Sequence, residues 1–99
     1  MHARLSRFAG LDPERLEQTV EEFQHGALPE LREREGFRGI TVAINRRSGQ
    51  AFAMTLWDSE ADMRASEKLA TEARERAIAS ARPSREPIVD HYEVVVQSE

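Results

Sequence analysis

The stretch that decides the fold is "AFAMTLWDSEADM", residues 51–63. Its first half is mostly apolar and predicts a strand over residues 50–57. Ser59 is followed three residues later by Asp62, a capping box with Asp in place of the usual Glu, so a helix should begin near residue 60. Trp57, the only tryptophan in the chain, stands where strand and helix meet. It either fills this corner as core or stacks on an aromatic ligand, and the residues alone leave both interpretations open.

A second strand is predicted just before this stretch, in "FRGITVAIN" over residues 37–45. Apolar and other residues alternate there, which places Ile40, Val42 and Ile44 on one face. The connection "RRSG" is a turn in which Gly49 is available for a positive φ. The two strands should therefore form a hairpin.

The remaining elements flank this hairpin on both sides. We expect a strand over 3–10, a helix over 13–25 with Asp12 as its N-cap, a short helical segment ending near 35, one continuous helix over 60–81 with an alanine-rich buried stripe from Ala61 to Ala81, and a strand over 88–97. The order strand, helix, strand, strand, helix, strand is that of the ferredoxin-like split βαβ arrangement. The sequence thus predicts one α+β domain over 1–99, with a four-stranded antiparallel sheet and both helices on one face.

Apolar side chains lie on both faces of the predicted strands. Ala43, Ala51, Val89 and Val95 add to the apolar character outside the main stripe of large residues. A sheet that is apolar on both faces needs a cover on each, and two helices cover only one. We therefore expect a homodimer in which two sheets face each other.

Composition excludes several classes of protein. Hydrophobic residues make up 39% and charged residues 32% of the chain, as in a soluble globular domain. The net charge of −4 comes from interspersed signs, so we expect no nucleic-acid partner. No segment approaches the roughly 20 apolar residues of a membrane helix, and the N-terminus lacks the apolar core of a signal peptide, so we expect a cytoplasmic protein without a membrane partner. The absence of cysteine excludes disulfides and thiolate chemistry.

Two segments carry a resemblance to a known family. "LPELREREGFRGITV" (28–42) and "MTLWDSEADMRAS" (54–66) resemble the antibiotic biosynthesis monooxygenases, a family of dimeric α+β barrels. The matching residues are Gly36, Phe37, Gly39, Trp57, Asp58, Ser59, Glu60 and Ala61. The resemblance implies a homodimer whose barrel pocket oxidises a quinol-type or polycyclic aromatic molecule without a cofactor. The alternative is a non-catalytic dimeric barrel that binds a small molecule.

The resemblance does not extend to every activity of that superfamily. Its haem-degrading members carry an Asn on the first strand, a second Trp in the second helix and a His further along that helix. This chain has no Asn before Asn45, no Trp after Trp57 and no His between His25 and His91, so we do not expect haem degradation. Polyketide-oxidising members place Asn and Tyr near the barrel Trp, where this chain has Ala53 and Met63.

His91 is the leading candidate for a catalytic base, since a histidine facing the barrel interior can take a proton near neutral pH. Its neighbour Tyr92 must face the other way, because side chains alternate along a strand. Trp57 is the candidate for stacking on the substrate ring. The alternative for each residue is a purely structural one, in which His91 is an exposed or edge-strand histidine and Trp57 is a core residue.

Arg7, Asn45 and Met63 complete the set of candidate substrate contacts. Arg4 and Arg7 face opposite ways on the first strand, and either could point into the lumen and bind an anionic oxygen. Asn45 closes a strand and also suits the turn, whereas Met63 lies near Trp57. The three histidines show no paired spacing, so we expect no metal site. The chemistry that the resemblance implies needs no cofactor, so we expect none.

Overall fold

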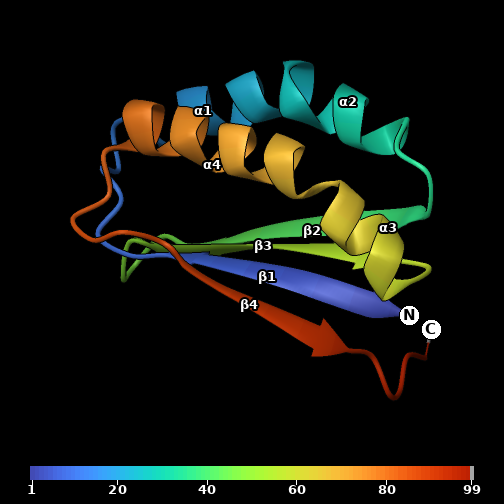
Figure 1. The fold of residues 1–99 in the computed structure, drawn as a ribbon. Coiled ribbons are helices and arrows are strands. Elements are labelled where there is room, and N and C mark those ends of the chain that lie inside the picture. The colour runs from blue at the N-terminus through green and yellow to red at the C-terminus, as the bar shows by residue number, and fades with distance from the viewer. Residues whose placement is uncertain (99) are drawn as a thin grey trace.

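The computed structural model describes residues 1–98 and shows a sheet with helices on one face (Figure 1). The elements are β1 (His2–Phe8), α1 (Leu16–His25), α2 (Ala27–Arg32), β2 (Phe37–Asn45), β3 (Gln50–Trp57), α3 (Glu60–Ala65), α4 (Glu67–Ala81) and β4 (Ile88–Glu93). The strand order is β2-β3-β1-β4, and all neighbours pair antiparallel. This confirms the predicted ferredoxin-like α+β class. The first helical region consists of two segments, α1 and α2, as predicted, whereas the predicted helix over 60–81 is divided into α3 and α4.

The hairpin of β2 and β3 has the bounds that the alternating pattern predicts. The Asn45 side chain accepts hydrogen bonds from the backbone N–H groups of Arg47 and Ser48, each at 3.1 Å. Gly49 adopts φ 73°, a left-handed conformation that favours glycine. The turn chemistry therefore fixes the register of the two central strands.

The corner between β3 and α3 contains the largest fully buried side chains of the described residues. Trp57 is fully buried, in a cluster with Leu31, Met63 and Leu69. The ring of Phe37 meets the Trp57 ring edge-on, with centroids 5.5 Å apart. The Ser59 hydroxyl accepts from the Asp62 backbone N–H at 3.1 Å, which confirms the predicted cap. The opening stretch of the sequence is thus a structural corner held by packing and by a helix cap.

The first helix begins later than predicted, at Leu16 rather than residue 13. Asp12 does not cap it: its Oδ1 accepts from the Glu14 backbone N–H at 3.0 Å, and its carbonyl accepts from Arg15. Residues 13–15 form a turn instead, because the Asp12 side chain bonds two residues ahead. Leu11 packs against Leu16, in a second core cluster with Ala81.

The predicted continuous helix over 60–81 is wrong, since it breaks at Ser66. The Ser66 hydroxyl donates to the Met63 carbonyl at 2.6 Å and competes with helix continuation. The break moves the buried stripe, so that Ala61 and Ala65 are exposed while Leu69 and Ala81 are buried.

Three other ends fall short of their predicted positions. β1 ends at Phe8 rather than residue 10, where Gly10 turns the chain with φ 65°. The short helix α2 ends at Arg32 rather than near residue 35. β4 ends at Glu93 rather than residue 97, because beyond this residue no strand lies beside it in the described chain.

The two faces of the sheet have different surroundings. The register aligns Arg4 with Thr55 and His91 on the face toward the helices. Leu5 is aligned with Met54 and therefore lies on the opposite face, which no helix of residues 1–98 covers (Figure 1). Leu5, Met54 and Leu56 are half-buried there. On the helix side, a cavity lies next to the sheet.

Candidate functional site

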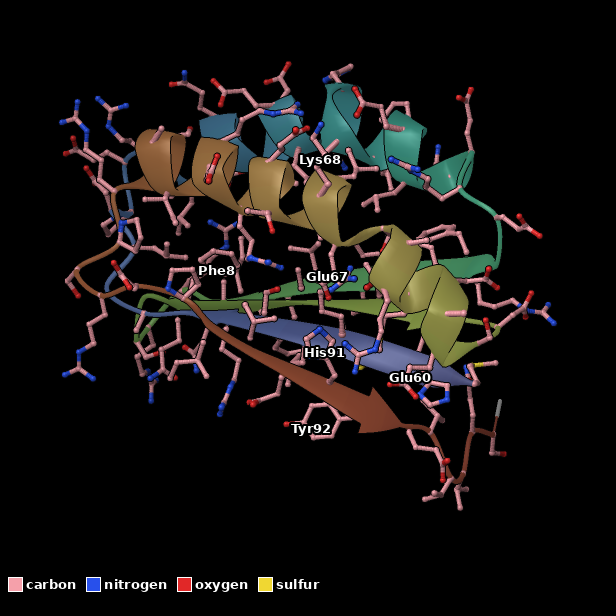
Figure 2. The ribbon with its side chains drawn as sticks, in the orientation of Figure 1. Phe8, Glu60, Glu67, Lys68, His91 and Tyr92 are labelled. Carbon is pink, nitrogen blue, oxygen red and sulfur yellow. The ribbon has the colours of Figure 1, made fainter. Side chains whose placement is uncertain are left out.

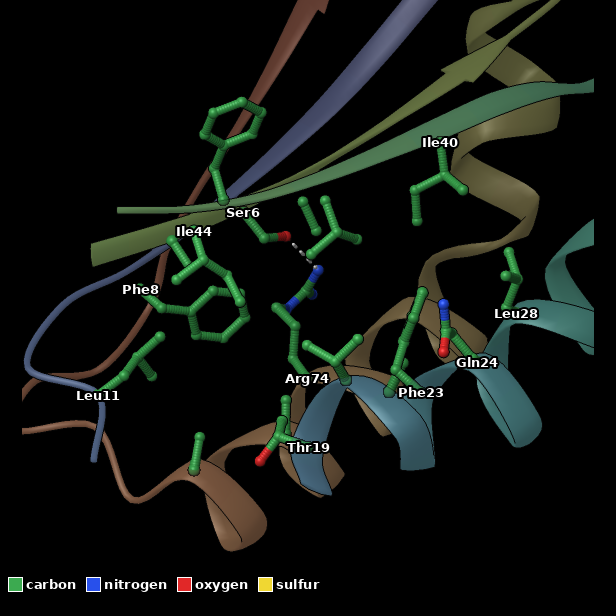
Figure 3. A pocket seen from close by; sticks show the side chains of 18 of the residues that line it. Ser6, Phe8, Leu11, Thr19, Phe23, Gln24, Leu28, Ile40, Ile44 and Arg74 are labelled. Carbon is green, nitrogen blue, oxygen red and sulfur yellow. Dashed lines mark hydrogen bonds between the residues drawn. The ribbon is translucent and has the colours of Figure 1, made fainter. Parts of the chain in front are cut away.

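A cavity of about 560 Å³ lies between the helices and the sheet. Phe23 and Leu28 line it from the helices, and Phe8, Ile40 and Ile44 from the strands (Figure 3). Its walls are largely apolar, with a few polar groups. This combination of apolar walls and a small number of polar side chains is typical of small-molecule sites, which range over roughly 300–1,000 Å³.

Arg74 is the most prominent polar side chain in the cavity. It extends from α4 across the space toward the sheet (Figure 3). Its Nη1 donates to the Ser6 hydroxyl at 3.4 Å and its Nη2 to the Thr71 hydroxyl at 3.3 Å. The Arg74 side chain is only 16% exposed. A cationic group is therefore held inside an apolar space by two long hydrogen bonds.

Arg4 is a second cationic side chain that lines the cavity, and it is only 2% exposed. Its Nη2 donates to the Met63 carbonyl at 2.6 Å and the Ser66 hydroxyl at 3.0 Å. The interruption of the helix at Ser66 therefore supplies both partners. Its guanidinium carbon lies 5.9 Å from the centroid of the Trp57 ring, within cation–π range. Its Nη1 is buried and has no hydrogen-bond partner among the described residues. Such an unmet donor costs about 1–3 kcal/mol.

Glu67 joins these cations to β4. Its Oε1 accepts from Arg4 Nε and Nη2 at 3.2 and 3.1 Å and from His91 Nε2 at 2.7 Å, and its Oε2 lies 4.0 Å from Arg74 Nη2. Figure 2 shows Glu67 and His91 pointing toward each other across the gap between α4 and β4. The side chains of Glu67 and His91 are both 36% exposed. The network thus runs from a buried arginine to a solvent-accessible histidine.

Burial and neighbouring charges have opposite effects on the pKa values of Glu67 and Arg4. Partial burial raises the pKa of the Glu67 carboxyl, but the hydrogen bond from His91 and the charge of Arg4 outweigh it, so the pKa lies below its ordinary value of 4.5. Burial lowers the pKa of Arg4, and Glu67 partly reverses the effect. Glu67 is therefore an ionised partner of the arginines, and as a result a weak base.

The structure places Trp57 and Met63 behind the cavity wall. Both are buried in the core, and neither is among the residues that line the cavity. Trp57 Nε1 donates to the Thr55 hydroxyl at 2.9 Å, so its polar atom has a partner within the protein. Their contact with the site is indirect, through the ring of Trp57 and the carbonyl of Met63 beside Arg4.

The other predicted residues lie apart from one another. Arg7 is on the uncovered face of the sheet, where it pairs with Asp90 at 3.1 Å. Asn45 is at the hairpin turn. His91 faces the helix side and Tyr92 the other side, as strand alternation predicts (Figure 2). Of the two arginines on β1, Arg4 is the one that faces the cavity.

Sequence reasoning missed Arg74 and Glu67. Both lie in a helix with charges at almost every turn, where most charged side chains point to solvent.

In residues 1–98, no three His, Asp or Glu side chains gather as a metal site would require. No helix in the same range is long and apolar enough to cross a membrane.

The known proteins that resemble this chain do so in structure. No family model matches the sequence, and no curated protein matches it. The monooxygenase ActVA-Orf6 of Streptomyces coelicolor, in complex with the ligand nanaomycin D, superposes with a TM-score of 0.74 at 18% identity, over 98% of this chain and 92% of that one. An antibiotic biosynthesis monooxygenase gives a TM-score of 0.72 at 11% identity, over 97% of this chain and 100% of that one. The heme-degrader MhuD of Mycobacterium tuberculosis, with two hemes in its active site, gives 0.67 at 18% identity, over 98% and 99%.

These likenesses extend over nearly the whole chain. They establish that it has the α+β barrel fold of the antibiotic biosynthesis monooxygenases, as the resemblance in sequence implied. Since the same fold carries different activities, the activity has to be argued from the site.

Proposed function

We propose that this protein is a cofactor-independent monooxygenase that binds a flat, hydroxylated aromatic molecule in the cavity between helices and sheet. The observation that carries the proposal is the cavity itself: about 560 Å³ of mainly apolar space with Arg74 projecting into it. The volume suits a molecule of two or three fused rings, and the guanidinium suits an oxygen substituent. The shared fold with a monooxygenase that binds nanaomycin D supports the same class of ligand.

The reaction would use the electrons of the substrate. A substrate of the quinol or anthrone type loses a proton to water and, as its anion, passes an electron to O₂. With an anthrone, one oxygen atom becomes a ring carbonyl, and the other leaves as water with the two hydrogens of that carbon. The protein supplies an apolar space and a positive charge beside the oxygen where negative charge develops.

The predicted site residues take different parts in this proposal. His91 acts through Glu67, as the end of a charge network that reaches the surface. Trp57 and Met63 act through Arg4, which they hold in place from behind the wall. Arg7 and Asn45 have structural partners elsewhere and are assigned no contact with the ligand.

The test is oxygen consumption with a panel of hydroquinones and anthrones. The informative variant is Ala53→Phe, because Ala53 lines the cavity and a larger side chain there would fill it. Ala79→Phe, on the exposed side of α4, is the matched control. We expect the wild type and the control to consume oxygen, and Ala53→Phe to lose most of this activity. Activity that survives Ala53→Phe unchanged would place the reaction elsewhere.

One observation favours a second function, ligand binding without turnover. The only acidic or histidine side chain that lines the cavity in the described chain is Glu17, which is exposed and paired with Arg46 at 2.6 Å. Among the described residues, the cavity thus has no free base of its own. Ligand binding that is blocked by Ala53→Phe, with oxygen consumption at background for every substrate, would favour this function.

We also propose that the uncovered face of the sheet is the interface of a homodimer. Phe52 and Tyr92 are exposed at the two sides of this face, with half-buried Leu5, Met54 and Leu56 between them. Val95 and Val96, which the sequence pattern placed in the last strand, are exposed beyond the end of β4. A second chain would cover the face and give the valine segment a strand to pair with.

A further inference from the structure

We propose that Arg4 and Arg74 form an anion subsite in the wall of the cavity, which takes one negatively charged oxygen group of a flat aromatic ligand. The group is a carboxylate or a phenolate, two sources of the same chemistry. The inference rests on the proposed function in one respect, that the cavity binds a flat aromatic molecule. It adds that the ligand must be an anion, and it holds whether or not the ligand is turned over.

The first support is an unmet hydrogen-bond donor. Arg4 lines the cavity, is almost completely buried, and has no acceptor for its Nη1 within the described chain. Buried guanidinium groups are normally satisfied at every nitrogen, because in a protein interior an unpaired charged donor is costly. An oxygen of a bound ligand is an acceptor that residues 1–98 do not provide.

The second support is the loose placement of Arg74. Its hydrogen bond to Ser6 is 3.4 Å long and its distance to Glu67 is 4.0 Å, both near the upper limit for such contacts. Figure 3 shows the side chain extending from α4 into the open cavity toward Ser6. Arg74 and Arg4 both reach the Glu67 carboxylate, so a ligand oxygen admitted by a small rotation of Arg74 would lie close to both guanidinium groups. The same rotation would exchange long contacts for a charge-assisted one.

The third support is the balance of charge. Two arginines share one carboxylate, Glu67, which leaves an excess of positive charge next to an apolar space. Glu17 does not correct the balance, since it pairs with Arg46. Electrostatic attraction is stronger in such surroundings than in water, so a single anionic group is the complement of this wall. Desolvation already lowers the pKa of Arg4, and a bound anion would offset that cost.

The test compares matched ligands of equal size. Anthraquinone-2-carboxylate and anthraquinone-2-carboxamide differ in charge, and quenching of Trp57 fluorescence reports their binding, since Trp57 is the only tryptophan. We expect the carboxylate to bind roughly tenfold more tightly. Arg74→Gln should reduce the preference to less than about threefold while the carboxamide affinity stays within twofold. Arg76→Gln, on an exposed position of the same helix, is the control and should preserve the preference.

A third ligand separates the two sources of anion. 2-Hydroxyanthraquinone changes colour when its phenol ionises, so its absorbance shows whether it binds as the phenolate. Tighter binding of either anion than of the carboxamide supports the subsite. The anion with the larger gain in affinity shows whether the subsite takes a carboxylate or a phenolate. Arg74→Lys keeps the charge and should retain part of the preference, which distinguishes loss of the subsite from damage to the fold.

Two results would overturn the inference, and they differ in what they say of the proposed function. Equal affinity for carboxylate and carboxamide, with the 2-hydroxy compound bound as the neutral phenol, would contradict the anion subsite but still support a cavity that binds aromatic molecules. If none of the three ligands binds, both the anion subsite and the proposed function are contradicted. Selective binding of an anion without oxygen consumption would contradict the monooxygenase reaction alone.

Discussion

Arg4 of β1 and Glu67 of α4, 63 residues apart in sequence, are joined by two hydrogen bonds to a single carboxylate oxygen. This pair ties the strand at the centre of the site to the first turn of α4, directly after the break at Ser66. Because Arg4 is buried and Glu67 is partly exposed, the pair connects the interior to the surface. Its contribution to stability can be measured apart from any activity.

Glu67→Gln is expected to destabilise the protein by about 1–3 kcal/mol. The substitution leaves the buried Arg4 charge without its counter-charge, but the exposure of Glu67 keeps the cost below that of a fully buried pair. Urea denaturation followed by Trp57 fluorescence measures the difference. Glu72→Gln, an exposed position on the same helix, is the control. Equal stability of the two variants would show that the ion pair contributes nothing.

The same carboxylate should make stability depend on acid pH. The folded pKa of Glu67 lies below its ordinary value of 4.5, so the folded state binds fewer protons and is favoured as pH rises. This contribution is fully present above the unfolded pKa and is lost as pH falls through the folded one. Between about pH 5 and pH 3 the wild type should therefore lose stability more steeply than Glu67→Gln. Parallel curves for the two proteins, measured by urea denaturation at each pH, would contradict the assignment.

Trp57→Phe is expected to affect stability more than function. The smaller ring leaves a cavity in a fully buried cluster and removes the hydrogen bond to Thr55, for a loss of about 1–3 kcal/mol. Because Trp57 does not line the cavity, binding of anthraquinone ligands should stay within about threefold of wild type, measured by calorimetry. A variant with unchanged stability and lost binding would show that Trp57 stacks on the ligand.

The fold could be predicted from the sequence wherever the signals were local. The alternating residues 37–57 and the Ser59 cap depend on neighbours within a few positions, and the structure has both as expected. The break at Ser66 and the late start of α1 could not be predicted in the same way. There, a serine or aspartate side chain competes with the helix for backbone groups, and tertiary packing decides the outcome.

The site was less predictable because its charged groups come from distant elements. Alternation showed that Arg4 and Arg7 face opposite ways, but only the pairing of β1 between β3 and β4 decides which one meets the helices. Arg74 lies in a charged segment whose other members are mostly exposed, so nothing local marks it as inward-facing. The chemistry of histidine alone marks His91 as a candidate, and its partner Glu67 lies 24 residues away on another element.

Met54→Asp is expected to convert a homodimer into a monomer. Met54 lies at the middle of the uncovered face, between Leu5 and Thr41 in the register, so a carboxylate there would be buried against a second sheet without a partner. Light scattering at about 10 μM, well above the dissociation constant of a stable dimer, should give twice the chain mass for wild type and the chain mass for the variant. Ala79→Asp, on the exposed side of α4, should remain dimeric. A wild-type mass equal to one chain would show that the protein is a monomer, and would contradict the proposal that a second chain covers the apolar face.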